Sequence, residues 1–123
     1  MHKDSNRPRR VAELIKRELA VLIPRELNDP RMHPVTLTGA EVSPDFSLAR
    51  IYFTLLGDSE EMRETTAALN HAAGFLRRTL KRRLVLRNVP ELRFYYDESV
   101  EKGARISGLI DRALSEDKGH KTD

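Results

Sequence analysis

The residues best suited to chemistry in this sequence are a dense group of basic side chains within residues 69–97. Seven side chains there are positive and two are negative, which gives +5 against +3 for the whole chain. The positive ones are Arg77, Arg78, Lys81, Arg82, Arg83, Arg87 and Arg93. Such a group suits a phosphate backbone, and it lacks the interspersed carboxylates of a surface that is charged only for solubility. The stretch predicts a nucleic-acid contact, with a merely solvated face as the alternative.

Helical spacing divides this stretch into an apolar side and a basic side. The apolar side is formed by Leu69, Ala73, Leu76 and Leu80. Arg78, Lys81 and Arg82 fall on the opposite side, where they can face RNA while the other side packs on a core. Arg83 returns to the apolar side, so we expect the helix to end near it and count it as a weaker candidate. Arg77 and Arg87 complete the group of candidates in this stretch.

A break is expected where the basic helix meets the helix before it. Ala72, Ala73 and Gly74 interrupt an otherwise continuous helical pattern that begins near Ser59. Glycine in a helix is less favourable than alanine by about 1 kcal/mol, so a kink or a close packing contact is expected at Gly74. Gly57, Asp58 and Ser59 end the preceding strand pattern and offer a cap for this helix, and Glu60 and Glu61 suit its first turn.

No constellation of residues suited to catalysis occurs in the sequence. The four histidines, His2, His33, His71 and His120, share no metal-ligand spacing, and the chain contains no cysteine. Phosphate-loop, dinucleotide-binding and nucleophile-elbow motifs are missing, and neither Ser43 nor Ser47 has a histidine nearby. We therefore expect a protein that is not an enzyme, with no metal, no cofactor and no small-molecule substrate.

The aromatic residues offer a second way to bind RNA. They cluster in two apolar runs as Tyr52, Phe53, Phe94, Tyr95 and Tyr96. Rings exposed on a sheet can stack on bases. Because such rings are usually buried, packing in the core and between strands is the preferred interpretation.

The length of 123 residues fits one domain, and 39% hydrophobic with 33% charged residues fits a soluble one. No apolar run is long enough for a membrane span or a signal peptide, so we expect a cytoplasmic protein that does not contact membranes. Residues 1–6 are expected to be a flexible lead-in, residues 7–114 the domain, and residues 115–123 a flexible tail.

The remaining elements follow from periodicity. Apolar residues at helical spacing run from Val11 to Ile23, after Pro8 in the first turn and before Pro24, which we expect to end the helix. The basic side chains at its start are Arg7, Arg9 and Arg10, which oppose the helix dipole and suggest a use in phosphate binding.

Strand patterns cover residues 35–43, 48–56 and 92–96, and the first two are joined by a turn at Ser43, Pro44 and Asp45. That short connection favours antiparallel pairing. A final amphipathic stripe within residues 106–114 predicts a short C-terminal helix. The result is an α+β domain in the order helix, strand, strand, bipartite helix, strand, helix, with helices on one face of a small sheet.

Several motifs in this order resemble the bacterial ribosome-binding factor A family. One runs from Gly74-x-Leu76-Arg77 through Leu84-x-Leu86-Arg87-x-x-Pro90-x-Leu92-x-Phe94-x-x-Asp97. The others are Arg7 with Arg10-Val11, Leu27-x-Asp29-Pro30-Arg31, and Val42-Ser43-x-Asp45. Together they span nearly the whole folded part, from Arg7 to about Leu109.

This resemblance implies a type II KH-like fold in which the family's Ala-x-Gly kink, here Ala72-Ala73-Gly74, replaces the RNA-clamping Gly-x-x-Gly loop. It implies a monomer that binds the free small (30S) ribosomal subunit and its 16S rRNA and assists late maturation, including the 5′ region. The family matters most in the cold, and its members leave before the large subunit joins. The residues expected to contact RNA are Arg77, Arg78, Lys81, Arg82, Arg87, Arg7, Arg9 and Arg10.

Two other classes of function remain open from the residues alone. A nucleic-acid-binding regulator could dimerise through the stripe within residues 106–114, although the strands between and after the helices disfavour a helix-turn-helix protein. A protein-binding module could use residues 41–64, where two basic and six acidic side chains give −4. Residues 2–17 carry six basic and two acidic side chains, or +4, so the charge is polarised.

Overall fold

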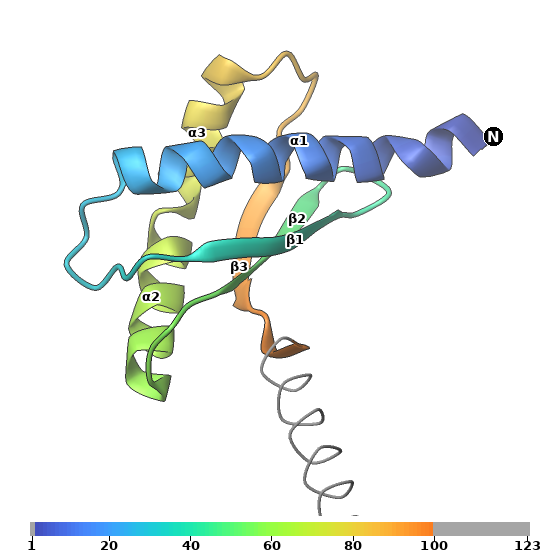
Figure 1. The fold of residues 1–123 in the computed structure, drawn as a ribbon. Coiled ribbons are helices and arrows are strands. Elements are labelled where there is room, and N and C mark those ends of the chain that lie inside the picture. The colour runs from blue at the N-terminus through green and yellow to red at the C-terminus, as the bar shows by residue number, and fades with distance from the viewer. Residues whose placement is uncertain (1, 100–123) are drawn as a thin grey trace, which may run out of the picture.

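The computed structural model describes residues 2–99, with side chains from Arg7 onward, and shows helices packed on a small sheet (Figure 1). In chain order the elements are α1 (His2–Glu26), β1 (Thr36–Val42), β2 (Leu48–Thr54), α2 (Ser59–His71), α3 (Ala73–Arg83) and β3 (Glu91–Tyr96). This order confirms the α+β prediction. The helix expected within residues 106–114 and the tail at residues 115–123 lie outside the described residues.

The sheet has the strand order β1-β2-β3, with β1 and β2 antiparallel and β2 and β3 parallel. The five-residue link between β1 and β2 permits the antiparallel pairing that was expected. Parallel pairing of β2 with β3 requires a long crossover, which α2 and α3 provide. The register of β1 shifts between Leu37 and Gly39, so Thr38 has no partner on β2. Its hydroxyl donates to the Asp97 carboxylate just after β3.

The core lies between one face of the sheet and the three helices. Alternate strand residues such as Ile51, Phe53 and Phe94 are buried completely or nearly so. From the helices, Leu19 and Leu76 meet them within one continuous cluster. Burying each large apolar side chain contributes about 1.5–3 kcal/mol. In Figure 1 α1 runs alongside β1 and crosses α3, in agreement with its contacts to both elements.

Helix α1 is longer at both ends than the sequence pattern indicated. It begins at His2, so Pro8 lies within it, and the prediction that Pro24 ends it is wrong, because it continues to Glu26. Proline lacks only its own backbone N–H, and its fixed φ suits a helix, so a proline in a last turn removes a single bond. The N–H of Leu27 still donates to the Ile23 carbonyl at 3.1 Å. Flexibility of residues 1–6 stays a prediction.

The break in the long helix falls at Ala72, which is both the C-cap of α2 and the N-cap of α3, with φ −86° and ψ −1°. The predicted kink is confirmed, but the reason given for Gly74 is wrong. Gly74 has no positive φ, and a Cβ there would meet only the Arg78 Nη1 atom at 3.5 Å, an ordinary contact. The cap predicted within residues 57–59 is formed by Asp58, whose carboxylate accepts from the Glu61 backbone N–H at 2.8 Å.

Within the part of the chain that the structure describes, no helix combines the length and apolar character that crossing a membrane requires.

Candidate nucleic-acid interface

Helix α3 presents its basic residues to solvent as expected. Arg78, Lys81 and Arg82 are exposed, whereas Leu76 and Leu80 are completely buried on the opposite side. Among residues 7–99, no carboxylate lies within 4.0 Å of the side-chain nitrogens of these three. Lys81 and Arg82 lie in the last turn of the helix, where the helix dipole stabilises positive charge. Three unpaired cations therefore stand in a row on a rigid element.

Arg77 has a different environment from its neighbour Arg78. Its side chain is half-buried, and its Nε–H donates to the backbone carbonyl of Val89 at 2.9 Å. This bond joins α3 to the segment that leads into β3. Arg77 was predicted from sequence to contact RNA, and the structure gives it a role in holding the fold.

Arg83 lies at the rim of the core rather than within it. It is exposed, and its Nε–H donates to the Glu18 carboxylate of α1 at 2.7 Å, so α1 and α3 are joined by an ion pair. Helical spacing placed Arg83 on the side of α3 that faces the core, and on that side it meets the Glu18 carboxylate of α1. An exposed pair of this kind contributes about 0–1 kcal/mol.

Arg7 and Arg87, which were predicted independently, are brought to the same place. Both line a hollow of about 250 Å³ whose other walls include Asp45, Phe46 and Asn88. The guanidinium carbon of Arg7 lies 5.5 Å from the centroid of the Phe46 ring, within cation–π distance. Arg9 and Arg10 are exposed on the same end of α1. The start of α1 and the segment between α3 and β3 thus extend the basic area of α3.

Phe46 is a feature of this hollow that the sequence did not reveal. Its φ of 61° makes it the one non-glycine residue with positive φ among the described residues. Such a conformation is unfavourable for a bulky side chain by about 1–3 kcal/mol and is found preferentially at functional sites. No local sequence signal marks it, because the residues usually found in this conformation are glycine, asparagine and aspartate.

The turn that holds Phe46 is organised by a single carboxylate. Asp45 accepts hydrogen bonds from the hydroxyls of Ser43 and Ser47, both at 2.7 Å, and from the Ser47 backbone N–H at 3.0 Å. These bonds lower the pKa of Asp45 from 3.8 to about 2, with the Ser47 hydroxyl contributing most, then the Ser43 hydroxyl and then the Ser47 backbone N–H. The predicted turn at Ser43, Pro44 and Asp45 is confirmed, and it fixes the position of the aromatic ring.

Within the loop motif Asp29-Pro30-Arg31, the first and last residues bind each other. The Asp29 carboxylate accepts from the Arg31 guanidinium at 2.8 Å and from the Arg31 backbone N–H at 2.9 Å. The side-chain hydrogen bond from Arg31 is the main reason that the pKa of Asp29 falls from 3.8 to about 2. The Arg31 guanidinium is therefore already bound within its own loop.

The kink lies beside a hollow of about 590 Å³, between the start of α3 and the free edge of β3. Its lining includes Ala73, Gly74 and Arg77 from the helix and Arg93 and Tyr95 from the strand. The hollow is therefore bordered by two cations, Arg77 and Arg93, by the acidic residue Glu91 and by Tyr95. It adjoins the basic helix directly.

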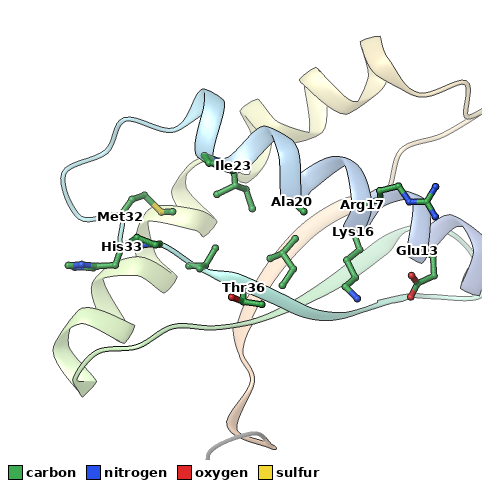
Figure 2. A pocket seen from close by; sticks show the side chains of 12 residues that line it. Glu13, Lys16, Arg17, Ala20, Ile23, Met32, His33 and Thr36 are labelled. Carbon is green, nitrogen blue, oxygen red and sulfur yellow. The ribbon is translucent and has the colours of Figure 1, made fainter.

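A further hollow, of about 550 Å³, lies between α1 and the start of β1 (Figure 2). Lys16 and Arg17 contribute from α1, and Met32 and His33 from the loop that follows it. His33 is within 3.4 Å of the Glu61 carboxylate of α2. Neither α3 nor the segment before β3 reaches this hollow, so it does not join the basic area.

Within the described part of the molecule, no three histidine, aspartate or glutamate side chains gather closely enough to hold a metal ion. His33 and His71 lie on separate elements, and the side chains of His2 and His120 are not described.

Comparison with known proteins supports the predicted family. The family model described as ribosome-binding factor A matches residues 7–110. A ribosome-binding factor A from Thioalkalivibrio sulfidiphilus is 52% identical over 123 residues, covering 100% of this chain and 95% of that protein. One from Pseudomonas paraeruginosa is 47% identical over 122 residues, covering 98% and 95%.

Solved structures agree with these relatives. The crystal structure of ribosome-binding factor A from Thermus thermophilus has a TM-score of 0.66 at 27% identity, covering 75% of this chain and 97% of that one. A putative ribosome-binding factor A from Thermotoga maritima, solved by NMR, has a TM-score of 0.65 at 36% identity, covering 76% and 89%. A homology model of the Thermus thermophilus factor, fitted into a cryo-EM map of its complex with 30S, has a TM-score of 0.52 at 26% identity, covering 69% and 93%. The KH-like fold is confirmed, and the chain belongs to the ribosome-binding factor A family.

Proposed function

We propose that this protein is a non-catalytic assembly factor that binds the free small (30S) ribosomal subunit and assists late maturation of its 16S rRNA, including the 5′ region. Family membership supports a ribosomal partner, and a relative has been fitted into a map of a 30S complex. The function implies a cytoplasmic monomer that matters most at low temperature and leaves before the large subunit joins.

The observation that carries the proposal is the row of cations on α3, which have no ion-pair partner among residues 7–99. We define the basic surface as Arg78, Lys81 and Arg82 of α3, Arg87 of the following segment, and Arg7, Arg9 and Arg10 of α1. These residues are all exposed, and they come from elements that border one another around Phe46 and the end of α3. Such a surface contacts phosphates and thereby sets position, while the shape of the rRNA supplies specificity.

Binding energy alone can perform the proposed task. A protein that binds one conformation of the rRNA more tightly than another shifts the population toward that conformation. Rigid elements favour this use of energy, since α3 is anchored by Leu76 and Leu80 and its basic side chains need no large rearrangement to meet phosphates.

The test is co-sedimentation with ribosomal particles from a bacterial lysate through sucrose gradients at low and moderate salt. Wild-type protein is expected with free small subunits and not with assembled ribosomes. The variant with Arg78, Lys81 and Arg82 all changed to Glu is expected to lose this association. Because the formal charge changes from +3 to −3, a matched control is needed, and Arg17, Arg25 and Arg63 are exposed residues outside the basic surface.

Reversal of these three control arginines to Glu gives the same net charge, so subunit binding should survive it if position matters. Equal loss in both variants would mean that net charge alone drives binding. Trailing of wild-type protein through all RNA-containing fractions, removed by moderate salt, would indicate a generic nucleic-acid binder. Association unaffected by the α3 reversal would favour a protein-binding module.

A further inference from the structure

The sheet has a second face, which carries side chains of the kinds that bind nucleic acids. Residues that alternate with the buried ones along β2 and β3 point away from the core. They include Arg50 and Tyr52 on β2 and Arg93 and Tyr95 on β3, with the acidic Glu91 at the start of β3. The parallel register pairs Arg50 with Arg93 and Tyr52 with Tyr95, so two cations stand next to two aromatic rings.

The two tyrosine rings form a pair on this face. Their centroids are 5.8 Å apart, and their planes meet at 32°. Tyr95 is 37% exposed, and Tyr52 is half-buried. The aromatic pair on the core side differs, because Phe53 is fully buried and meets Tyr96 edge-on at 85°. The expectation that the rings pack between strands holds for both pairs, and Tyr95 is the most exposed of the four rings.

Arg50 and Arg93 lie side by side on adjacent strands, so their positive charges repel each other. Like charges directly opposite each other in a sheet are destabilising. Across β1 the register sets Glu41 against Arg50, which offsets one of the charges. Within residues 7–99, neither Arg50 nor Arg93 has a carboxylate within 4.0 Å of its side-chain nitrogens. A phosphate between them would relieve the repulsion.

This face is continuous with the hollow at the kink. Arg93 and Tyr95 line that hollow together with Gly74 and Arg77, at the start of the basic helix. The backbone edge of β3 is occupied at its centre, because Asn70 pairs with both polar groups of Phe94. A ligand that crosses this edge at Phe94 therefore contacts side chains, because the backbone groups there are already hydrogen-bonded. A path therefore leads from α3, past Gly74 and over β3, to Tyr52.

We propose that Tyr52 and Tyr95 form a stacking platform for unpaired RNA bases, with Arg50 and Arg93 binding the adjoining phosphates. This rests on the proposed function and extends it, because it assigns a single-stranded segment to a surface separate from α3. Flat rings beside cations suit single-stranded nucleic acid, since every base has a π-face and the backbone is anionic. Such a platform tolerates many sequences.

The chain allows a direct optical test, because it contains three tyrosines and no tryptophan. Two of those tyrosines belong to the platform, so stacking should quench the protein's emission. The probe is a labelled single-stranded oligouridine of about eight nucleotides, in the size range bound by small single-strand-binding domains. Anisotropy of the label gives the affinity independently. The wild-type protein should show both binding and quenching.

Changing Tyr52 and Tyr95 to Leu should weaken oligouridine binding by roughly tenfold or more for each ring. Changing both to Phe keeps the stacking surfaces and should retain the affinity. Tyr96→Phe alters a half-buried ring outside the platform. It should leave the affinity unchanged and raise the fraction of emission quenched, because both remaining tyrosines belong to the platform. A second variant, with Arg50 and Arg93 changed to Gln, should also bind more weakly and show a smaller dependence on salt, and it covers the case in which the Leu variant does not fold.

Folded Leu and Gln variants that bind oligouridine as tightly as wild type would overturn the platform. Self-association of the wild-type protein that the Leu variant abolishes, without quenching by RNA, would assign the face to a second copy and also overturn it. Either result leaves the proposed function intact if the α3 reversal still removes subunit binding. Conversely, if the α3 reversal leaves subunit binding unchanged, the proposed function is contradicted, whatever result the tyrosine variants give.

Discussion

The side-chain amide of Asn70 on α2 pairs with both backbone polar groups of Phe94 on β3. Its Nδ2 donates to the Phe94 carbonyl at 3.0 Å, and its Oδ1 accepts from the Phe94 N–H at 2.8 Å. The amide thus imitates one residue of a neighbouring strand at the free edge of the sheet. This satisfies backbone groups that are expensive to leave unpaired and protects the edge from other chains.

Substitution of Asn70 by Ala should therefore destabilise the protein, although the residue itself is exposed. We expect a loss of about 1–3 kcal/mol in the free energy of unfolding, because both groups of Phe94 lose their partner. Urea unfolding measures this loss. The neighbouring exposed residue His71, which forms no hydrogen bond or ion pair with β3, is the control, and His71→Ala should stay within about 0.5 kcal/mol of wild type. A stable Asn70→Ala protein would mean that water replaces the amide.

Arg77 and Arg78 are adjacent in sequence and should respond to the same change in opposite ways. Arg77→Gln should lower the free energy of unfolding by about 1–2 kcal/mol, because the Val89 carbonyl loses its donor. Arg78→Gln should leave stability within about 0.5 kcal/mol, since its side chain is exposed and has no ion-pair partner among residues 7–99. In subunit binding, Arg78→Gln should reduce the slope of log affinity against log salt by roughly 0.7–0.9. Similar behaviour of the two variants in both assays contradicts this assignment.

The positive φ of Phe46 predicts an inverted order of stability for two substitutions. Valine retains more apolar surface than asparagine, but its branched side chain fits a φ of 61° poorly, whereas asparagine adopts it readily. Phe46→Asn should be more stable than Phe46→Val by at least about 1 kcal/mol in urea unfolding. Valine as the more stable of the two would show that the turn changes conformation when the ring is removed.

The depressed pKa of Asp29 predicts a loss of stability in acid. Its folded value of about 2 lies below the ordinary 3.8, so its bonds to Arg31 stabilise the fold above pH 4. That contribution disappears as pH falls from about 4 to 2. The melting temperature of Asp29→Asn, lower than that of wild type at pH 7, should approach it across this range. If the difference in melting temperature between the two proteins does not change with pH, the carboxylate charge is unimportant. Added salt should reduce this difference at neutral pH, because the pair of Asp29 and Arg31 is solvent-exposed.

The sequence by itself determined the order of the elements, the one-sided helices and the basic row on α3. These depend on local periodicity: an apolar residue every three or four positions, or every second position, defines a face wherever the element lies. The cap at Asp58 and the turn around Asp45 were accessible for the same reason, since their bonds join residues close in sequence.

Only the tertiary structure decided which partners the functional side chains have. It gave Arg77 the Val89 carbonyl, set Arg83 against Glu18, and gathered Arg7 and Arg87 around Phe46. Periodicity separates Tyr95 from Phe94, but it does not say which face of a strand the helices will cover. That choice depends on the strand register and on packing between elements far apart in sequence, which a local pattern does not contain.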